Sequence, residues 1–312
     1  MAQLLNAWVW FETVLLVIIA TPFAFILFCL TAPFDKGRYA AGRFFRLLGV
    51  LTVKLNPLWK FEMGGDFIRD PRRPYVAVSN HESYADIFLI SHLPWEMKWL
   101  SKETMFKIPC FGWMMRMAGD IEVRRGERTS IVRAMKEARD RLSKRVSVMI
   151  FPEGTRSRDG ELLPFKDGAF RLALEAGAPI LPIVVAGTRD CMQKGTFRFQ
   201  KARARVKVLP PIEVTGMTIA DVAELRDRTR AVIAEARHAQ PLRKPLRGAL
   251  VHLGQRIVAD GDGTEAVERP GLVALEHVLA HLVAGRLEHR DHGHAALREL
   301  VHAAVDGAHA PV

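Results

Sequence analysis

A histidine and an aspartate lie close together in the stretch NHESYADIF, residues 80–88. The apolar run YVAVS precedes this stretch and reads as a strand, and the apolar run IFLISHL overlaps its end and reads as a helix. A histidine oriented by a carboxylate can act as a general base, and here the pair is His81 and Asp86. Ser83 and Asp86 also have the spacing of a helix capping box. A turn that caps a helix would hold His81 rigidly, so the two interpretations are compatible.

A second stretch with chemical potential is SVMIFPEGTRS, residues 147–157. It reads as a buried strand that runs into a turn, and Gly154 allows that turn to be tight. Arg156 follows the strand at the sheet edge where α/β proteins usually bind ligands. Its planar guanidinium suits two parallel hydrogen bonds to a phosphate. Taken alone, the same stretch also fits a surface turn with a solvated arginine.

A third stretch, residues 99–125, places Lys102 just after a predicted strand. Lys102 is therefore a second candidate cation for an anionic ligand, and Lys107 is the alternative. Turns are expected at Pro109, Gly112 and Gly119. Several adaptable apolar residues lie between them and fit either an acyl-chain slot or plain core: Phe111, Trp113, Met114, Met115 and Met117.

Short strand patterns alternate with helical patterns along the middle of the chain. The predicted strands are 75–79, 97–100, 120–123, 147–151, 180–186 and 205–209. The predicted helices are 86–92, 129–143, 167–176 and 218–238. This alternation predicts an α/β fold with a mostly parallel sheet flanked by helices.

The N-terminal part of the chain contains an uncharged apolar run, residues 13–32. Its length matches one crossing of a bilayer. Pro22 lies inside the run and would either kink a spanning helix or split it into a re-entrant hairpin. The following segment, 43–55, mixes Phe and Leu with spaced cations and fits the membrane interface. Four cations follow the run and place that flank on the cytoplasmic side: Lys36, Arg38, Arg43 and Arg46.

The composition and net charge of the chain limit the classes of partner that it is expected to bind. The chain has 312 residues, 49% of them hydrophobic, and a formal net charge of +11. The positive charge favours an anionic partner such as a phosphorylated substrate or an acidic membrane surface. Nucleic acid is disfavoured, because basic stretches interleaved with aromatic residues are missing. The three cysteines are widely spaced. This spacing is typical of a protein from a reducing compartment and argues against a disulfide framework.

These stretches together resemble the 1-acylglycerol-3-phosphate acyltransferases of the glycerolipid acyltransferase superfamily. That family has an N-H-x-S-x-x-D block, a lysine block ending in P-x-x-G, an F-P-E-G-T-R-S block and a later apolar strand with a proline. The matching residues here are 80–86, 102–112, 151–157 and 180–184 around Pro182. The resemblance covers roughly residues 1–215.

The resemblance implies a role for each matching residue. His81 is the general base, Asp86 orients it, and Lys102 and Arg156 bind the phosphate of lysophosphatidate. Glu153 and Gly154 shape the acceptor site, with Glu153 near a glycerol hydroxyl. The remaining residues of these blocks support the site: Asn80, Ser83, Thr155 and Pro182.

The implied reaction transfers an acyl chain from acyl-CoA or acyl carrier protein to the sn-2 hydroxyl of lysophosphatidate, giving phosphatidate. A thioester is already activated, so neither a covalent intermediate nor a metal or cofactor is expected. The expected partners are membrane lipids and the two substrates, with no nucleic acid. The expected location is the inner membrane, with the active site facing the cytoplasm.

The implied organisation has three parts: a membrane-associated helical segment at 1–56, an acyltransferase α/β domain at 57–240, and a helical C-terminal extension of unknown role at 241–312. His277 and His281 have a spacing that can bind zinc but is more often coincidental.

Three alternatives remain open at this point. Another lysolipid acceptor, such as a lyso-ornithine lipid, would relax the need for Arg156. A membrane adaptor would explain the apolar terminus but not the ordered blocks. A serine hydrolase is disfavoured, because no G-x-S-x-G motif occurs and Ser83 has no second base.

Overall fold

The computed structural model describes residues 2–192, 195–196 and 198–238, all within one compact unit. A seven-stranded sheet forms its centre, in the order β1-β7-β6-β2-β5-β3-β4. Neighbouring strands are parallel except β6 and β7, which are antiparallel. The strands are β1 Trp59–Gly65, β2 Val76–Ser79, β3 Met97–Lys102, β4 Ile121–Val123, β5 Ser147–Ile150, β6 Ile180–Ala186 and β7 Ala202–Val208.

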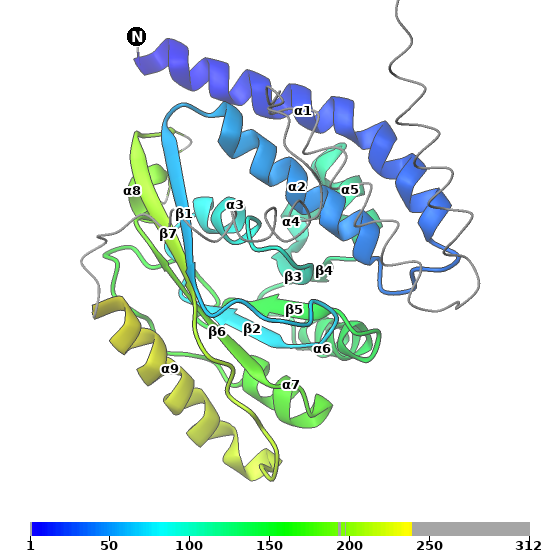
Figure 1. Cartoon of the computed structure of the whole chain (residues 1–312), viewed down its shortest axis with the longest axis vertical. Coiled ribbons are helices and arrows are strands. Elements are labelled where there is room, and N and C mark those ends of the chain that lie inside the picture. The colour runs from blue at the N-terminus through cyan, green and yellow to red at the C-terminus, as the bar shows by residue number, and fades with distance from the viewer. Residues whose placement is uncertain (1, 193–194, 197, 239–312) are drawn as a thin grey trace, which may run out of the picture. The chain divides into compact units, whose positions relative to one another are not determined.

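Helices cover both faces of the sheet (Figure 1). One face carries α6, α7 and α9, and the other carries α3 and α8 with α1, α2 and α5 beyond them. The helices are α1 Ala2–Thr31, α2 Tyr39–Leu55, α3 Ala85–Ile90, α4 Glu103–Phe106, α5 Phe111–Ala118, α6 Arg128–Ser143, α7 Gly168–Ala176, α8 Thr188–Cys191 and α9 Val222–His238, with a short 3-10 helix at Ile219–Asp221.

The central strands are buried on both faces, as the apolar run in each sequence requires. In β5, Val148 and Ile150 face the α6, α7 and α9 layer, whereas Met149 faces the α3 layer. β6 divides its side chains in the same way. The predicted α/β fold with a mostly parallel sheet is therefore confirmed.

Several element predictions need correction. Strand β1 was not predicted, and it pairs in parallel with β7 along its full length, from Trp59 opposite Ala202 onwards. Helices α4 and α5 were also missed. Gly112 lies inside α5 rather than in a turn. Glycine is required there because a Cβ would come within 2.2 Å of the Phe106 carbonyl oxygen. The predicted C-terminal extension, with His277 and His281, lies outside the described residues.

Helix α1 runs unbroken through Pro22, so the proline does not divide the apolar run into a hairpin. One side of α1 packs on α2 and α5 through Ala20 and Ala24. The other side exposes large apolar residues along its length: Leu4, Trp8, Phe11, Val14, Ile18, Ile19, Phe23, Phe25, Ile26 and Leu30. By length and composition α1 is able to cross a membrane.

The cations after α1 do not all face outward. Arg43 donates to the carbonyl of Leu93, and Arg46 is buried in an ion pair with Asp120. Two of the four cations used to predict membrane orientation therefore stabilise the protein interior instead. Lys36 is exposed, so it can still meet a charged surface.

Candidate active site

Three neighbouring strands end at the same edge of the sheet and bring the predicted site residues together. In the parallel register, Val78 of β2 lies opposite Ile150 of β5, and Met149 lies opposite Trp99 of β3. The turn after β2 carries His81, the turn after β5 carries Glu153 to Arg156, and β3 ends at Lys102. Ligands usually bind at this edge of an α/β sheet.

His81 and Asp86 form the predicted pair. Nδ1 of His81 lies 2.7 Å from Oδ2 of Asp86, and the aspartate is fully buried. A buried carboxylate accepts a hydrogen bond from the Nδ1–H group, so the ring lone pair is on Nε2. Among the described residues, Nε2 of His81 has no hydrogen-bond partner, so this nitrogen is the one available to take a proton from a substrate.

The same carboxylate also orders the turn. Oδ2 of Asp86 accepts the backbone N–H groups of Glu82 at 2.7 Å and Ser83 at 3.0 Å. The Ser83 hydroxyl accepts from the Ala85 N–H at 3.2 Å and donates to the Met192 carbonyl at 2.7 Å. One carboxylate therefore orders the turn before α3 and also bonds the histidine ring. The capping box forms only in part, because α3 begins after Tyr84 and the Ser83 hydroxyl accepts the Ala85 N–H rather than that of Asp86. The general-base role of His81 stays a prediction. Ser83 is buried and engaged in the fold, which disfavours a serine nucleophile.

The two motif turns are bonded directly to each other. Oε1 of Glu153 accepts the backbone N–H of His81 at 2.8 Å, and the His81 carbonyl accepts the N–H of Ser157 at 2.9 Å. The His81 ring stacks on Phe151, with 3.9 Å between the ring centres. Both main-chain groups and the ring of the histidine are thus held by residues 151–157.

The predicted cations follow two different strands, β5 and β3. The Arg156 guanidinium lies over the Tyr84 ring, 3.8 Å from its centre, in contact with the turn that carries Asp86. Lys102 is exposed at the end of β3 and makes no hydrogen bond or ion pair with the described residues. Lys107 is ion-paired with Glu103 at 2.5 Å. This difference favours Lys102 over Lys107 as the cation available for a ligand.

The supporting residues fix the strand ends. The Asn80 side chain pairs with the backbone N–H and carbonyl of Val185 on β6, both at 2.9 Å. Pro182 is buried in β6 opposite Val78, and its carbonyl accepts the Leu209 N–H. Thr155 is exposed beside Arg156.

Gly154 has a positive φ of 69°, and a Cβ there would lie 2.9 Å from Nζ of Lys166. The positive φ therefore favours glycine at this turn, whereas the end of the flexible Lys166 side chain is able to move aside.

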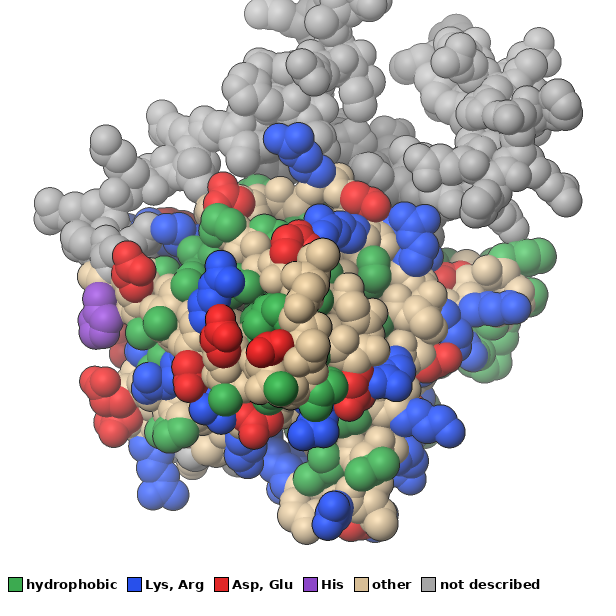
Figure 2. Space-filling view, turned by 90° about the horizontal axis from the view of Figure 1, so that it is seen from below, with side chains coloured by type: hydrophobic (Ala, Val, Ile, Leu, Met, Phe, Trp, Pro, Cys, Tyr) green, Lys and Arg blue, Asp and Glu red, His purple; other side chains and the backbone are tan. Residues whose placement is uncertain are grey.

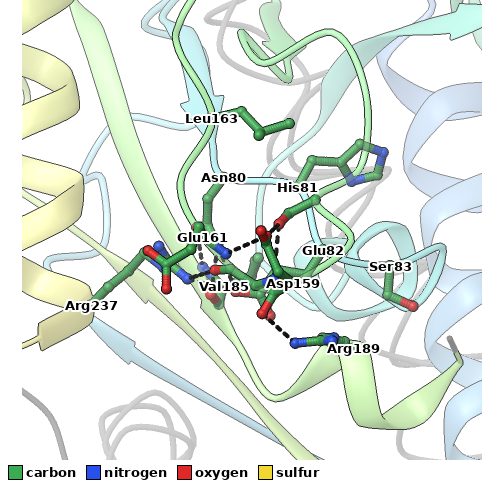
Figure 3. A network of polar contacts seen from close by, with 12 residues as sticks. Asn80, His81, Glu82, Ser83, Asp159, Glu161, Leu163, Val185, Arg189 and Arg237 are labelled. Carbon is green, nitrogen blue, oxygen red and sulfur yellow. Dashed lines mark hydrogen bonds and ion pairs between the residues drawn. The ribbon is translucent and has the colours of Figure 1, made fainter. Parts of the chain in front are cut away.

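Two buried carboxylates near His81 have unusual ionisation. Burial raises the pKa of Glu82 to about 7; the Asp86 charge also raises it, and Arg237 lowers it. Burial likewise raises the pKa of Glu153 to about 7, although hydrogen bonds from the backbone N–H groups of His81 and Leu163 lower this pKa. Figure 3 shows Glu82 beside Asn80 and His81, with Arg237 reaching towards them from α9. The described part of the chain contains no cluster of three or more His, Cys, Asp or Glu side chains suited to a metal ion.

Comparisons with known proteins agree with this geometry. The model of the Acyltransferase family matches residues 61–186, which include all the residues of the turns described above. The human 1-acyl-sn-glycerol-3-phosphate acyltransferase alpha is 35% identical over 189 residues, covering 59% of this chain and 67% of the human protein. This chain belongs to the 1-acyl-sn-glycerol-3-phosphate acyltransferase family.

The similarity extends to plant enzymes and to a solved structure of this family. A chloroplastic member from Brassica napus is 36% identical over 184 residues, covering 59% of this chain and 52% of the plant protein. This chain thus spans about half the length of that relative. The crystal structure of the 1-acyl-sn-glycerophosphate acyltransferase PlsC from Thermotoga maritima matches with a TM-score of 0.66 and 25% identity, over 78% of this chain and 97% of that one.

The contacts of some site residues could not be predicted from the sequence. Glu82, Phe151 and Tyr84 lie inside or beside recognised blocks, but their contacts depend on the two turns meeting. The apolar residues considered for an acyl slot divide: Met114 and Met115 are buried core between α5 and its neighbours, whereas Trp113 is 54% exposed.

Proposed function

We propose that this protein transfers an acyl chain from a thioester to the sn-2 hydroxyl of lysophosphatidate and so produces phosphatidate. The observation that carries the proposal is the 2.7 Å contact between His81 Nδ1 and Asp86 Oδ2 at the sheet edge, which leaves Nε2 available as a base. Membership of the 1-acyl-sn-glycerol-3-phosphate acyltransferase family supports the choice of acceptor.

In the proposed reaction, Nε2 of His81 takes the proton of the acceptor hydroxyl as its oxygen attacks the thioester carbonyl carbon. The carbon becomes tetrahedral, and Asp86 stabilises the imidazolium without taking the proton. When the carbon–sulfur bond breaks, the imidazolium returns a proton to the leaving thiolate. Atoms and charge balance without a covalent acyl-enzyme.

Arg156 and Lys102 bind the acceptor phosphate in this proposal. Arg156 lies over Tyr84, so a phosphate on its guanidinium would be close to the turn that carries His81. Holding the phosphate places the hydroxyl against Nε2, and such positioning is worth a large share of the barrier. The acyl donor is a thioester of coenzyme A or of acyl carrier protein.

Helix α1 attaches the protein to a membrane in this proposal. Its outward side is apolar along its length, and both its ends contact the domain: Asn6 bonds the backbone of Phe199 twice, at 3.0 Å each, and Phe28 lies under the Arg38 guanidinium. These contacts favour a helix that lies in one leaflet over a helix that crosses. We place the active site on the cytoplasmic side of the inner membrane.

The face around α7 and α9 has a different character. Figure 2 shows basic and acidic side chains mixed there, with small, separated apolar patches. Such a face suits water, and it contrasts with the outward side of α1.

The test is an acyl-transfer assay on membranes or detergent-purified protein, with wild type, His81→Ala and Arg156→Ala. His81→Ala should lose activity by about a hundredfold or more. Arg156→Ala should mainly raise KM for lysophosphatidate. Arg171→Ala is a matched control for Arg156→Ala, because Arg171 is exposed on α7, on the opposite face.

The acceptor is decided in the same assay by comparing lysophosphatidate with a lyso-ornithine lipid. Activity on lysophosphatidate that depends on both residues supports the proposal. Transfer only to the ornithine lipid, still dependent on His81, would overturn the acceptor. Acyl transfer that does not depend on His81 would overturn the proposed base.

A further inference from the structure

Helix α9 reaches the catalytic turn through one side chain, Arg237. This residue lies in the last turn of α9, beyond residue 186 where the family match ends. Its Nη2 lies 3.3 Å from Oε1 of Glu82, the residue next to His81. The same guanidinium donates to the carbonyl of Gly160, in the loop that follows the EGTRS turn. Figure 3 shows Arg237 extending from α9 into this network.

Glu82 has few ways to satisfy its charge. Its side chain is 9% exposed, and its described partners are Arg237 and the Asn80 amide, at 3.2 Å from Oε1. Two further buried acids, Asp86 and Glu153, repel the negative charge of Glu82. Among the described residues, Arg237 is the one cation ion-paired with Glu82. Without Arg237 the charged form of Glu82 is strongly destabilised, so the carboxyl takes up a proton or the turn rearranges, and in either case the bridge to the Gly160 carbonyl is lost.

The loop on the other side of Arg237 also leads back to the histidine. Gly160 donates its N–H to the Ser157 hydroxyl at 2.9 Å, and Ser157 donates its own N–H to the His81 carbonyl. The 157–163 loop further provides the Leu163 N–H to Oε2 of Glu153. Arg237 therefore joins the 80–86 turn, which carries His81, to the 157–163 loop, which bonds the His81 carbonyl and Glu153.

We propose that Arg237 is a positioning residue for His81: by bridging Glu82 and the Gly160 carbonyl, it holds the 80–86 turn and the 157–163 loop in the arrangement that acyl transfer requires. This inference rests on the proposed function for its kinetic test and on the contacts alone for its structural test. Arg237 touches neither reacting atoms nor, in this proposal, the substrate phosphate.

The kinetic test compares Arg237→Met and Arg237→Lys with wild type. Arg237→Met should lower kcat by roughly ten- to a hundredfold, as expected when a catalytic group is misplaced by a fraction of an ångström to an ångström. KM for lysophosphatidate should change by less than about threefold, because Arg156 is untouched. Arg237→Lys keeps the charge near Glu82 and should recover part of the lost kcat. A change confined to KM would overturn the positioning role.

Two further arginines of α9 provide matched controls. Arg226→Met removes ion pairs with Asp167 and Asp227 from the same helix and should leave kcat unchanged. Arg230→Met removes contacts with the 162–163 carbonyls but none with Glu82. If Arg230→Met lowers kcat as much as Arg237→Met, the route through Glu82 is wrong.

The Glu82 route is tested by combining Arg237→Met with Glu82→Gln. Residues that act as one unit are non-additive, so the double variant should be no slower than the slower single variant. Multiplying losses would overturn the proposed unit.

A structural measurement separates this inference from the proposed function. Hydrogen exchange on the full chain should show the amides of 80–86 and 157–163 exchanging about tenfold faster in Arg237→Met than in Arg226→Met. Faster exchange in a protein that transfers no acyl group would retain the structural link and reject the proposed function. Unchanged exchange, with or without activity, would overturn the inference.

Discussion

Glu153 holds His81 by its main chain and leaves the imidazole ring to Asp86. Oε1 of Glu153 accepts the His81 N–H at 2.8 Å, and the glutamate is 4% exposed. Glu153, which the sequence analysis assigned to the acceptor site, thus also has a structural role in holding His81. Contact between Glu153 and a glycerol hydroxyl stays a prediction, but both carboxylate oxygens already accept backbone N–H groups.

The substitution Glu153→Gln should therefore act through geometry. A glutamine oxygen can replace only one of the two carboxylate acceptors, and its NH₂ group would face a backbone donor at the other position. We expect a fall in kcat of about tenfold or more, as for a misplaced base, with little change in KM. Steady-state kinetics check this. A rise in KM at constant kcat would favour the glycerol contact instead.

Asp86→Asn should be far more damaging, because Oδ2 of Asp86 accepts three donors at once. Loss of the carboxylate removes the group that fixes the tautomer, and a fall in kcat on the order of a thousandfold or more is expected. The double variant with His81→Ala should be no slower than the slower of the two single variants. Independent, multiplying losses would show that Asp86 serves only the helix start.

Stability should depend on pH through Glu82 and Glu153, whose pKa values burial raises to about 7. Between roughly pH 4.5 and pH 7 the native protein keeps protons that the unfolded chain releases, so the free energy of unfolding should fall as pH rises. Each group contributes at most about 1.4 kcal/mol per pH unit. Denaturant unfolding at several pH values checks this, and the double variant Glu82→Gln, Glu153→Gln should have a flatter profile. An unchanged profile in that variant would contradict the assignment.

Gly154→Ala should impair both the turn and the site. The residue has φ of +69°, and the new Cβ would meet Lys166 Nζ at 2.9 Å. Gly177→Ala is the matched control, because its φ of +61° is similar but no atom lies within 4 Å of the new Cβ. Both variants should lose about 1 kcal/mol or more of stability from backbone strain. Gly154→Ala alone should also reduce acyl transfer. Equal activity in the two variants would show that the Lys166 contact has no effect on the site.

A buried charge network joins α2 to β3 and should be important for stability. Lys98 Nζ lies 3.0 Å from Oε1 of Glu96 and donates to the Arg38 carbonyl at 2.7 Å, with both side chains fully buried. Lys98→Met leaves Glu96 with less compensation and should cost about 3–5 kcal/mol. The exposed Arg73–Glu213 pair provides the control, and Arg73→Ala should cost less than about 1 kcal/mol. Thermal or denaturant unfolding measures the stability of both variants. Equal losses of stability in Lys98→Met and Arg73→Ala would contradict the importance of the buried network.

The outward side of α1 should govern membrane binding. Replacing Phe11, Ile18 and Phe25 with Ser removes three large side chains, each more than half exposed. Each contributes up to roughly 1.5–3 kcal/mol when buried in an apolar environment, so partitioning into vesicles should fall strongly. Ile219→Ser, at an exposed position near α9, is the control. Vesicle flotation measures the bound fraction. Undiminished binding of the triple variant would show that α1 is not the anchor.

The sequence by itself determined the chemistry-bearing residues and most of the secondary structure. His81, Asp86 and Arg156 stand beside apolar runs whose length and periodicity are local properties, so their positions at strand ends could be predicted. The parallel sheet followed from the alternation of strands and helices. Strand β1 was missed although Trp59, Phe61 and Met63 alternate with two charged residues, a pattern typical of a half-buried strand.

Only the tertiary structure decided how these residues are held. Glu153 meets His81 across 72 positions, and Arg237 meets Glu82 across 155. No local pattern encodes such contacts, because they exist only when β2, β5 and α9 pack together. The same reason explains Arg43 and Arg46, whose spacing suggested a membrane flank but whose charges lie against interior partners. Sequence spacing determines which residues lie on the same helix or strand. Packing determines which distant residues form ion pairs and hydrogen bonds.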